Sequence, residues 1–231
     1  MTHLLSCFRF VVYTIVLIVS TSARADSYEA FFKAVAMDDA ATVTSLLDRG
    51  FDPNATNPQG HPALLLAVRE GSPRVTRALL AHPELKPDAP NAFGETALMM
   101  AALRGDFALA QRLYAMGASI DRAGWTPLHY AASGPDAAIV RWLLELRSPI
   151  DVRAPNGNTP LMMAAGYGLI DVADELLSLG ANPTLRNAAG LDAAEFARRA
   201  GRDRLAQRLE NESRRRSEKT APGSGGVNSP S

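Results

Sequence analysis

Residues 124–132 read Gly124-Trp-Thr-Pro-Leu-His-Tyr-Ala-Ala132, and this stretch recurs along the chain. It returns as Gly94-Glu-Thr-Ala-Leu-Met-Met-Ala-Ala102 and as Gly157-Asn-Thr-Pro-Leu-Met-Met-Ala-Ala165, with weaker copies that start at Gly60 and Gly190. The steps between successive glycines are 34, 30, 33 and 33 residues. A period of this size is typical of stacked repeat proteins, in which each repeat is one supersecondary element.

Each copy of the stretch carries the signals of a helix start. Thr96, Thr126 and Thr159 lie where a threonine hydroxyl can accept a hydrogen bond from an unsatisfied N–H of the first turn. Pro127 and Pro160 follow at the first helical position, where a missing N–H has no consequence. Further apolar residues at helical spacing predict a second helix in each repeat. The sequence therefore predicts an all-α fold built from stacked helix pairs.

This pattern resembles the ankyrin repeat over residues 27–210. The stretch from Thr126 to Ala132 is close to the family signature, and Gly180-Ala-Asn-Pro183 is similar to the usual entry of its hairpin loop. The resemblance implies a solenoid of L-shaped repeats, each with two antiparallel helices and a β-hairpin-like finger. It also implies that His129 links a helix start to the neighbouring repeat, which makes a structural role the expectation rather than catalysis.

We predict one ankyrin-repeat domain over residues 26–212. It contains six repeats, at residues 27–56 (N-terminal cap), 57–90, 91–120, 121–153, 154–186 and 187–212 (C-terminal cap). The remaining residues 213–231 have almost no apolar content, which predicts a disordered tail.

Residues 1–25 have the pattern of a secretory signal peptide. An apolar run over residues 10–20 is too short to span a bilayer as a helix, and Ala23-Arg-Ala25 has the small-x-small form of a cleavage site. We predict cleavage between Ala25 and Asp26, with an uncleaved membrane anchor as the alternative, and a periplasmic or secreted mature protein. The only cysteine, Cys7, lies in this leader, so the mature chain has no disulfide and no thiolate site.

The charge is zero overall but unevenly distributed. Residues 26–197 carry 13 basic and 20 acidic side chains, whereas residues 198–219 carry 9 basic and 4 acidic ones. The basic stretch has no interleaved aromatic residues, so we interpret it as a solvated cap and predict no nucleic-acid binding. A weak attraction to anionic lipid or to an acidic partner stays open.

The chain lacks the patterns of a catalytic or metal site. After the leader its histidines are His61, His82 and His129, and none has a partner at metal-ligand spacing. No nucleophile-elbow phrase and no glycine-rich phosphate loop is present. We therefore predict a protein that is not an enzyme and has no catalytic residue, metal or cofactor.

Two departures from the repeat are informative. The loop before Gly124 is three residues shorter than the loop before Gly190, which predicts a truncated finger and a notch beside Trp125. The second helix of the fourth repeat ends at Arg147-Ser-Pro149, where other repeats have Gly-Ala. Arg147 is therefore expected to adopt a positive φ, unless the helix ends differently.

The resemblance implies that a partner lies against the fingers and the first-helix face. Carried over position by position, this hypothetical protein-binding surface contains Gln59, His61, Phe93, Glu95, Arg104, Arg122, Trp125, Ser133, Asn156, Asn158 and Tyr167. Phe93, Trp125 and Tyr167 stand out because aromatic residues are enriched at interface hot spots. The alternative is that they pack locally against the next finger.

We thus predict a periplasmic or secreted module that binds a protein partner through its concave face; its oligomeric state stays open, with a monomer favoured. Resemblance to bacterial periplasmic ankyrin proteins suggests a role in oxidative-stress protection. The alternatives are an immunity or inhibitor protein for a toxin and, from another functional class, a scaffold that carries a ligand site.

Overall fold

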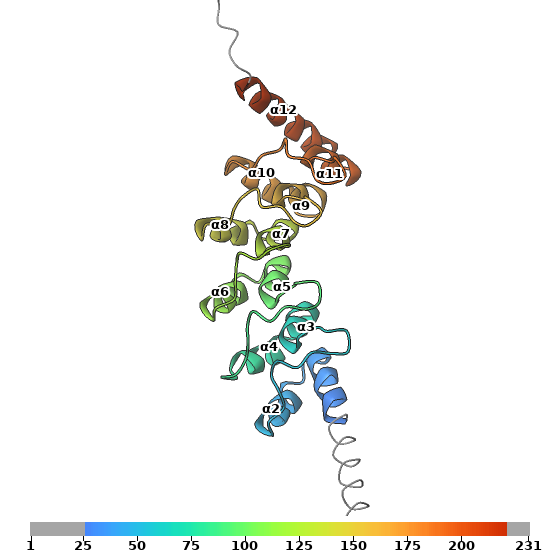
Figure 1. Ribbon diagram of the computed structural model, residues 1–231, viewed down its shortest axis with the longest axis vertical. Coiled ribbons are helices and arrows are strands. Elements are labelled where there is room, and N and C mark those ends of the chain that lie inside the picture. Colours follow the sequence, from blue (N-terminus) through green and yellow to red (C-terminus); the bar gives the residue numbers. More distant parts are fainter. Residues whose placement is uncertain (1–25, 221–231) are drawn as a thin grey trace, which may run out of the picture. The chain divides into compact units, whose positions relative to one another are not determined.

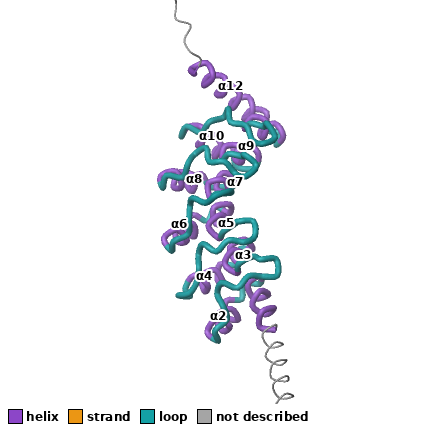
Figure 2. Tube along the Cα trace, viewed as in Figure 1, coloured by secondary structure: helices purple, strands orange, loops and turns teal. Residues whose placement is uncertain are grey.

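The chain forms two compact bodies, Met1–Ala97 and Leu98–Ser231. The computed structural model describes residues 26–220 of them, without the side chains of residues 219 and 220. Every regular element in this described part is a helix (Figures 1 and 2), which confirms the all-α prediction. The one β-bridge among the described residues joins Thr56 and Pro62 in a hairpin loop.

The N-terminal body contains two helix pairs. These are a helix over residues 26–36 with α2 (Ala40–Asp48), and α3 (Ala63–Glu70) with α4 (Pro73–Leu80). The first pair is held by Phe31, which is fully buried and stacks on Phe51 with ring centroids 4.3 Å apart. The turn between its helices is fastened to the next pair, because the N–H of Val75 donates to Asp38 Oδ1 at 2.9 Å.

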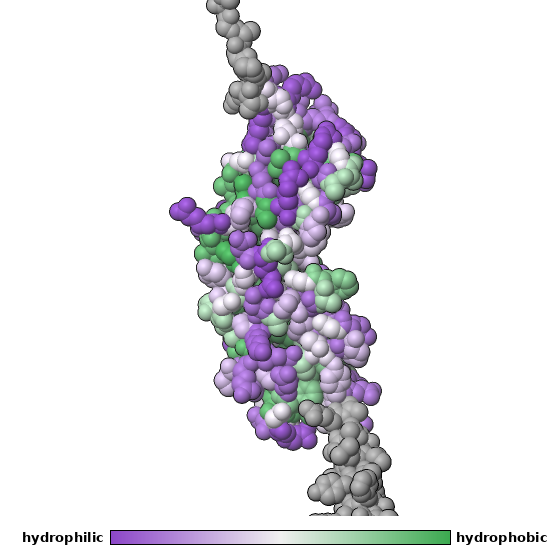
Figure 3. Space-filling model, in the orientation of Figure 1, coloured by the Kyte–Doolittle hydropathy of each residue, from purple (hydrophilic) through white to green (hydrophobic). Residues whose placement is uncertain are grey.

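The C-terminal body contains most of α5 (Ala97–Arg104) and the seven helices α6 to α12. They are α6 (Phe107–Ala115), α7 (Pro127–Ser133), α8 (Ala137–Glu145), α9 (Pro160–Gly166), α10 (Ile170–Ser178), α11 (Ala193–Arg199) and α12 (Asp203–Thr220). The first helices α5, α7 and α9 form one row and the second helices α6, α8 and α10 form another (Figure 1). Apolar side chains, green in Figure 3, gather over α8 and α10.

Small residues allow the first helices to approach closely. Ala131, Ala132 and Ala164 are fully buried between α7 and α9. A Cβ added at Gly168 would lie 2.1 Å from the carbonyl oxygen of Ala132, so no larger residue fits there. Larger apolar side chains from the second helices, such as Ile139, complete the core.

The helix ends follow the sequence signals. Helices α7 and α9 begin at Pro127 and Pro160, as predicted. The hydroxyl of Thr159 accepts a hydrogen bond from the N–H of Met162 at 3.4 Å. Just after α8, Arg147 has a φ of +72°, a left-handed conformation that Gly117 and Gly180 supply in the neighbouring repeats, so the expected positive φ is confirmed.

The prediction of a disordered tail from residue 213 is wrong for residues 213–220, which continue α12. Leu205 and Leu209 anchor this helix in the core. Its later turns are held because Arg216 pairs with Glu212 at 3.3 Å and donates to the carbonyl oxygen of Gly180 at 3.2 Å. The polar composition of residues 213–220 therefore did not prevent them from forming a helix, because this helix packs against the preceding repeat.

The predicted leader, residues 1–25, and the last residues, 221–231, lie outside the described residues. Within residues 26–220 no helix combines the length and the apolar content needed to cross a membrane.

Candidate protein-binding surface

Four loops between residues 26 and 220 fold into fingers of one design. In each, the N–H of the first residue donates to the carbonyl oxygen of the fifth at 2.9 Å, over residues 57–61, 91–95, 154–158 and 187–191. The fourth residue is a glycine with φ between +76° and +79°, a conformation that other residues adopt at a cost. These loops are the β-hairpin-like fingers that the repeat pattern predicts.

An asparagine side chain shapes three of the fingers. Asn57, Asn91 and Asn187 stand at the first position, and each Oδ1 accepts the N–H groups two and four residues further on, at 2.9–3.1 Å. Asparagine forms such local turns readily. The sequence analysis missed these residues, although the phrase Asn-x-x-Gly at positions 57, 91 and 187 was available as a signal.

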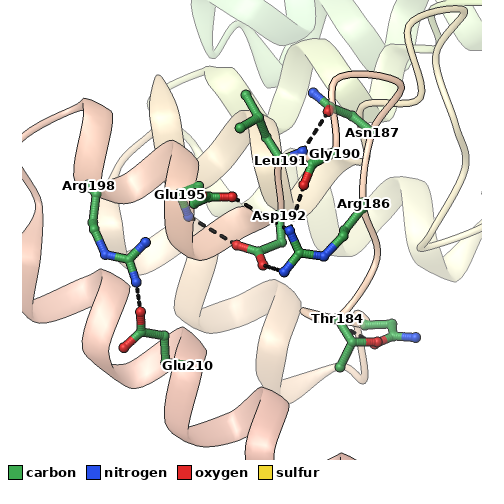
Figure 4. Close-up of polar contacts among 10 residues, drawn as sticks. Thr184, Arg186, Asn187, Gly190, Leu191, Asp192, Glu195, Arg198 and Glu210 are labelled. Atoms are coloured by element: carbon green, nitrogen blue, oxygen red, sulfur yellow. Dashed lines mark hydrogen bonds and ion pairs between the residues drawn. The ribbon is translucent and has the colours of Figure 1, made fainter.

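The last finger is also fixed by charge (Figure 4). Arg186 donates to the carbonyl oxygen of Gly190 at 2.6 Å and pairs with Asp192 at 2.8 Å. Asp192 in turn accepts the N–H of Glu195 at 3.1 Å and so caps α11. The finger and the helix that follows it are therefore held as one piece.

Two of the variable residues that follow a finger glycine, His61 and Asn158, contact the next finger. The Nδ2 of Asn91 lies 3.1 Å from His61 Nδ1, and the Nδ2 of Asn187 donates to Asn158 Oδ1 at 2.8 Å. Asn158 is only 6% exposed, so little of its side chain is available to a partner. His61 is half-buried by the same arrangement, and Glu95 accepts from Asn91 Nδ2 at 2.7 Å.

The loop before Trp125 is built differently from these fingers. Its shorter chain turns on Ser119, whose hydroxyl donates to the carbonyl oxygen of Asp121 at 2.7 Å. Beside it lies a hollow of about 250 Å³. Its lining residues are Leu103, Trp125, His129, Tyr130, Ser133 and Met163. Residues of the first helices α5, α7 and α9 enclose this hollow together with Trp125, and no residue of the shortened loop lines it.

Aromatic contacts form one wall of this hollow. The Trp125 ring meets the His129 ring edge-on at 5.2 Å and the Tyr130 ring at 6.3 Å. These contacts leave Trp125 half-buried. Trp125 is thus preorganised by its own repeat and still presents part of its ring to the hollow.

His129 is fully buried behind this wall and has both ring nitrogens engaged. The N–H of Thr126 donates to Nδ1 at 3.2 Å, and Nε2 donates to the carbonyl oxygen of Asn158 at 3.1 Å. Burial lowers the pKa of His129 below 6.5, although the carbonyl groups of Asn158 and Val152 oppose this shift. The neutral imidazole in this position links two repeats through hydrogen bonds, which agrees with the expected structural role.

The other predicted contact residues differ in exposure. In the N-terminal body Gln59 is exposed and Phe93 is 76% exposed. In the C-terminal body Arg104 and Asn156 are exposed and Tyr167 is 64% exposed, with its ring edge-on to Phe196 at 6.3 Å. The other two, Arg122 and Ser133, are half-buried.

The arrangement offers surface for binding rather than groups for chemistry. Among residues 26–220 no three His, Cys, Asp or Glu side chains come together as a metal site would require. The one histidine beside the hollow, His129, uses both nitrogens in the framework. The side chains that line the hollow are mainly apolar and aromatic, like those in the core of a protein–protein interface.

Comparison with known proteins adds the family. A model of ankyrin repeats (3 copies) matches residues 31–123 and 98–187. The tyrosine-protein kinase Shark of Drosophila melanogaster is 32% identical over 174 residues, which cover 73% of this chain and 18% of that protein. The NF-kappa-B inhibitor delta of Mus musculus is 31% identical over 188 residues, which cover 67% of this chain and 57% of that protein. The chain thus spans less than two thirds of these relatives.

A solved structure matches over most of both chains. It is described as the Bd0816 predatory endopeptidase from Bdellovibrio bacteriovorus in complex with immunity protein Bd3460. The similarity to a chain of that structure has a TM-score of 0.65 at 26% identity and covers 79% of this chain and 97% of that one.

Proposed function

The chain belongs to the ankyrin-repeat family, whose repeats form protein-interaction modules, and we propose that it binds a protein partner outside the cytoplasm. The observation that carries the binding proposal is the hollow of about 250 Å³ beside the shortened loop. Its walls are apolar and aromatic, and Trp125 is already held in place by His129 and Tyr130. A preorganised aromatic side chain loses little rotamer entropy on binding, which favours affinity.

Each body by itself also carries an exposed aromatic residue. Phe93 projects from a finger of the N-terminal body, and Tyr167 projects from the end of α9 in the C-terminal body. Tyrosine and tryptophan are enriched among interface hot spots. We infer that these side chains and the hollow make contact with the partner.

Affinity capture from the native compartment tests this proposal. Trp125→Ala removes the wall of the hollow and Phe93→Ala removes the finger aromatic, and both variants are expected to recover at least ten-fold less partner. Arg77→Ala is the control, because Arg77 is exposed on the second helix α4, which contributes no residue to the predicted surface. If all three variants recover equal amounts of the partner, the assignment of the site is wrong.

The proposed location rests on the leader pattern of residues 1–25. Mass spectrometry of the chain expressed from its full coding sequence is expected to find an N-terminus at Asp26 in the fraction outside the cytoplasm. An intact Met1 in the cytoplasmic fraction would refute the location. The same capture experiment identifies the pathway, including the suggested link to oxidative stress if the partner belongs to it.

A second candidate function is inhibition of an enzyme, as an immunity protein does. It is favoured by the likeness to a chain of the endopeptidase–immunity protein complex, which extends over 97% of that chain. The distinguishing measurement is the activity of the captured partner with and without this protein. Inhibition that Trp125→Ala abolishes supports an immunity function, whereas full activity in the bound state supports a binding module alone.

A further inference from the structure

The turn between α9 and α10 carries three exposed apolar side chains. Tyr167, Leu169 and Ile170, which we call the apolar turn, are 64%, 51% and 44% exposed. The matching turns before α6 and α8 have one large apolar side chain between them, the half-buried Phe107. The apolar turn presents roughly 300 Å² of surface, which is the size of functional patches on monomeric proteins.

Leu169 stands at the N-cap of α10, where its side chain accepts no hydrogen bond from the first turn. Asp39, Asp106 and Asp136 occupy this position before α2, α6 and α8, and each accepts an N–H of the first turn. Leucine is among the least favoured residues at an N-cap, and aspartate and asparagine are among the most favoured. A half-exposed leucine thus replaces a stabilising cap, which indicates a contact with another molecule.

Two contacts place the apolar turn beside the last repeat. Arg202 donates through Nη1 to the carbonyl oxygens of Ala164 and Ala165, at 3.1 Å each, and so fixes the start of α12 against the end of α9. The Tyr167 ring lies edge-on to the Phe196 ring of α11 at 6.3 Å. The apolar turn is therefore held next to α11 and α12, which close this end of the C-terminal body in Figure 1.

Between the apolar turn and α12 lies a hollow of about 620 Å³. This volume is in the range of sites that bind small ligands or single side chains of a partner. Its lining residues are Ile170, Asp203, Arg204, Leu205, Gln207 and Arg208. The hollow thus combines apolar surface from both sides with charged groups of α12.

One cation of the hollow is left without a partner. Arg208 pairs with Asp174 at 3.0 Å. Arg204 is exposed and forms no ion pair or hydrogen bond with any group that the structure describes. The nearby acids Asp171 and Asp203 each lie in the first turn of a helix, where the helix dipole offsets part of their charge.

The surroundings of the hollow are basic. Residues 193–218 carry eight basic and five acidic side chains. Two of the acids, Glu210 and Glu212, are paired with Arg198 and Arg216 inside this segment. The remaining excess of positive charge makes an acidic partner complementary to this surface.

We propose that the apolar turn and this hollow bind an acidic segment of a partner protein that carries an apolar side chain. The apolar side chain enters the hollow between Ile170 and Leu205, with Leu169 at its rim. A neighbouring carboxylate pairs with Arg204, whose planar guanidinium can hold both carboxylate oxygens. A concave site fits a protruding side chain of a protein better than the surface of a lipid bilayer.

This site shares no lining residue with the hollow beside Trp125, so the inference does not rest on the proposed function. It gives a role to the basic stretch of residues 198–219, for which the sequence left anionic lipid and an acidic partner open.

NMR titration of the isotope-labelled chain, expressed from its full coding sequence, tests the site. The probe is the peptide acetyl-Glu-Glu-Leu-Glu-Glu-amide. Two matched peptides replace its leucine by alanine or its glutamates by glutamine. The probe is expected to shift the amide resonances of Leu169, Ile170 and Arg204. Each matched peptide is expected to bind about five-fold more weakly or worse, because it lacks the anchor or the charge.

Variants separate the site from general effects. Leu169→Asn is expected to weaken the probe about five-fold and to raise the melting temperature by about 2–4 °C, because it removes the apolar contact and restores a cap. Arg204→Glu is expected to weaken the probe at least as much. The controls Leu179→Asn, at the other end of α10, and Arg215→Glu, further along α12, should leave the affinity unchanged. Trp125→Ala should also leave it unchanged, so failure of this site and failure of the proposed function are seen separately.

Three results would overturn the proposal. The probe shifts no amide of the apolar turn, the control variants weaken it as much as Leu169→Asn does, or Leu169→Asn lowers the melting temperature and so shows that Leu169 serves folding. Binding of phosphatidylglycerol vesicles that Leu169→Asn abolishes, without any response to the peptide, would likewise overturn it and make a membrane the occupant.

Discussion

The end of α8 holds two residues that the structure marks as destabilising. Arg147 has a φ of +72°, where Gly117 and Gly180 end the neighbouring second helices at +97° and +102°. The next residue, Ser148, is 7% exposed, and its hydroxyl oxygen has no hydrogen-bond partner. We predict that Arg147→Gly combined with Ser148→Ala stabilises the protein.

The magnitude follows from the two sites. A residue with a Cβ loses about 1–2 kcal/mol in the left-handed region, and the greater freedom of unfolded glycine removes about 0.5–1 kcal/mol of that gain. Arg147→Gly should therefore add about 0.5–1 kcal/mol to the free energy of unfolding. Burial of an unpaired hydroxyl costs about 1–3 kcal/mol, so Ser148→Ala should add about 1 kcal/mol or more. Ala118 and Ala181, 2% and 0% exposed at the equivalent positions, show that a methyl group packs well there.

Urea denaturation checks this prediction. The double variant is expected to gain about 2 kcal/mol, with a higher midpoint and an unchanged slope. In thermal unfolding, a domain of this size should gain about 4–8 °C. Arg147→Ala is the control, since it removes the charge and keeps the Cβ. The reasoning is refuted if Arg147→Ala stabilises as much as Arg147→Gly, or if Ser148→Ala leaves the midpoint unchanged.

Three further predictions concern the stack. Burial lowers the pKa of His129 in the folded state, so the contribution of neutral His129 to the free energy of unfolding is complete above pH 6.5 and is lost as the pH falls below it, by up to about 1.4 kcal/mol per pH unit. His129→Met, which copies the residue in the neighbouring repeats, should therefore flatten the pH dependence of the urea midpoint between pH 7 and 5. An unchanged pH dependence contradicts the assignment. Gly168→Ala should destabilise by about 3 kcal/mol, because the new Cβ would overlap the carbonyl oxygen of Ala132, and a near-normal melting temperature would show that the helices can separate without penalty. The hydrogen bond between Asn158 and Asn187 should give a coupling of about 1 kcal/mol in a double-mutant cycle with alanine, whereas additive effects would mean that the fingers are not joined there.

The sequence alone determined the helix starts, the helix ends and the period. Pro127 and Pro160 begin helices, and the positive φ at Arg147 was expected from the missing glycine. These features depend on interactions within about four residues, so a single repeat contains all the information needed to predict them. The shortened loop before Trp125 was predictable for the same reason, because it follows from a count of residues.

Only the tertiary structure decided which residues face solvent. Asn158 occupies a variable position of the repeat, but Asn187, 29 residues away, covers it. Arg216 keeps α12 ordered through a carbonyl group 36 residues away, which the polar composition of this segment did not indicate. The repeat period predicts that the repeats stack. It does not predict which side chains of neighbouring repeats contact one another, because those residues lie about thirty positions apart in the sequence.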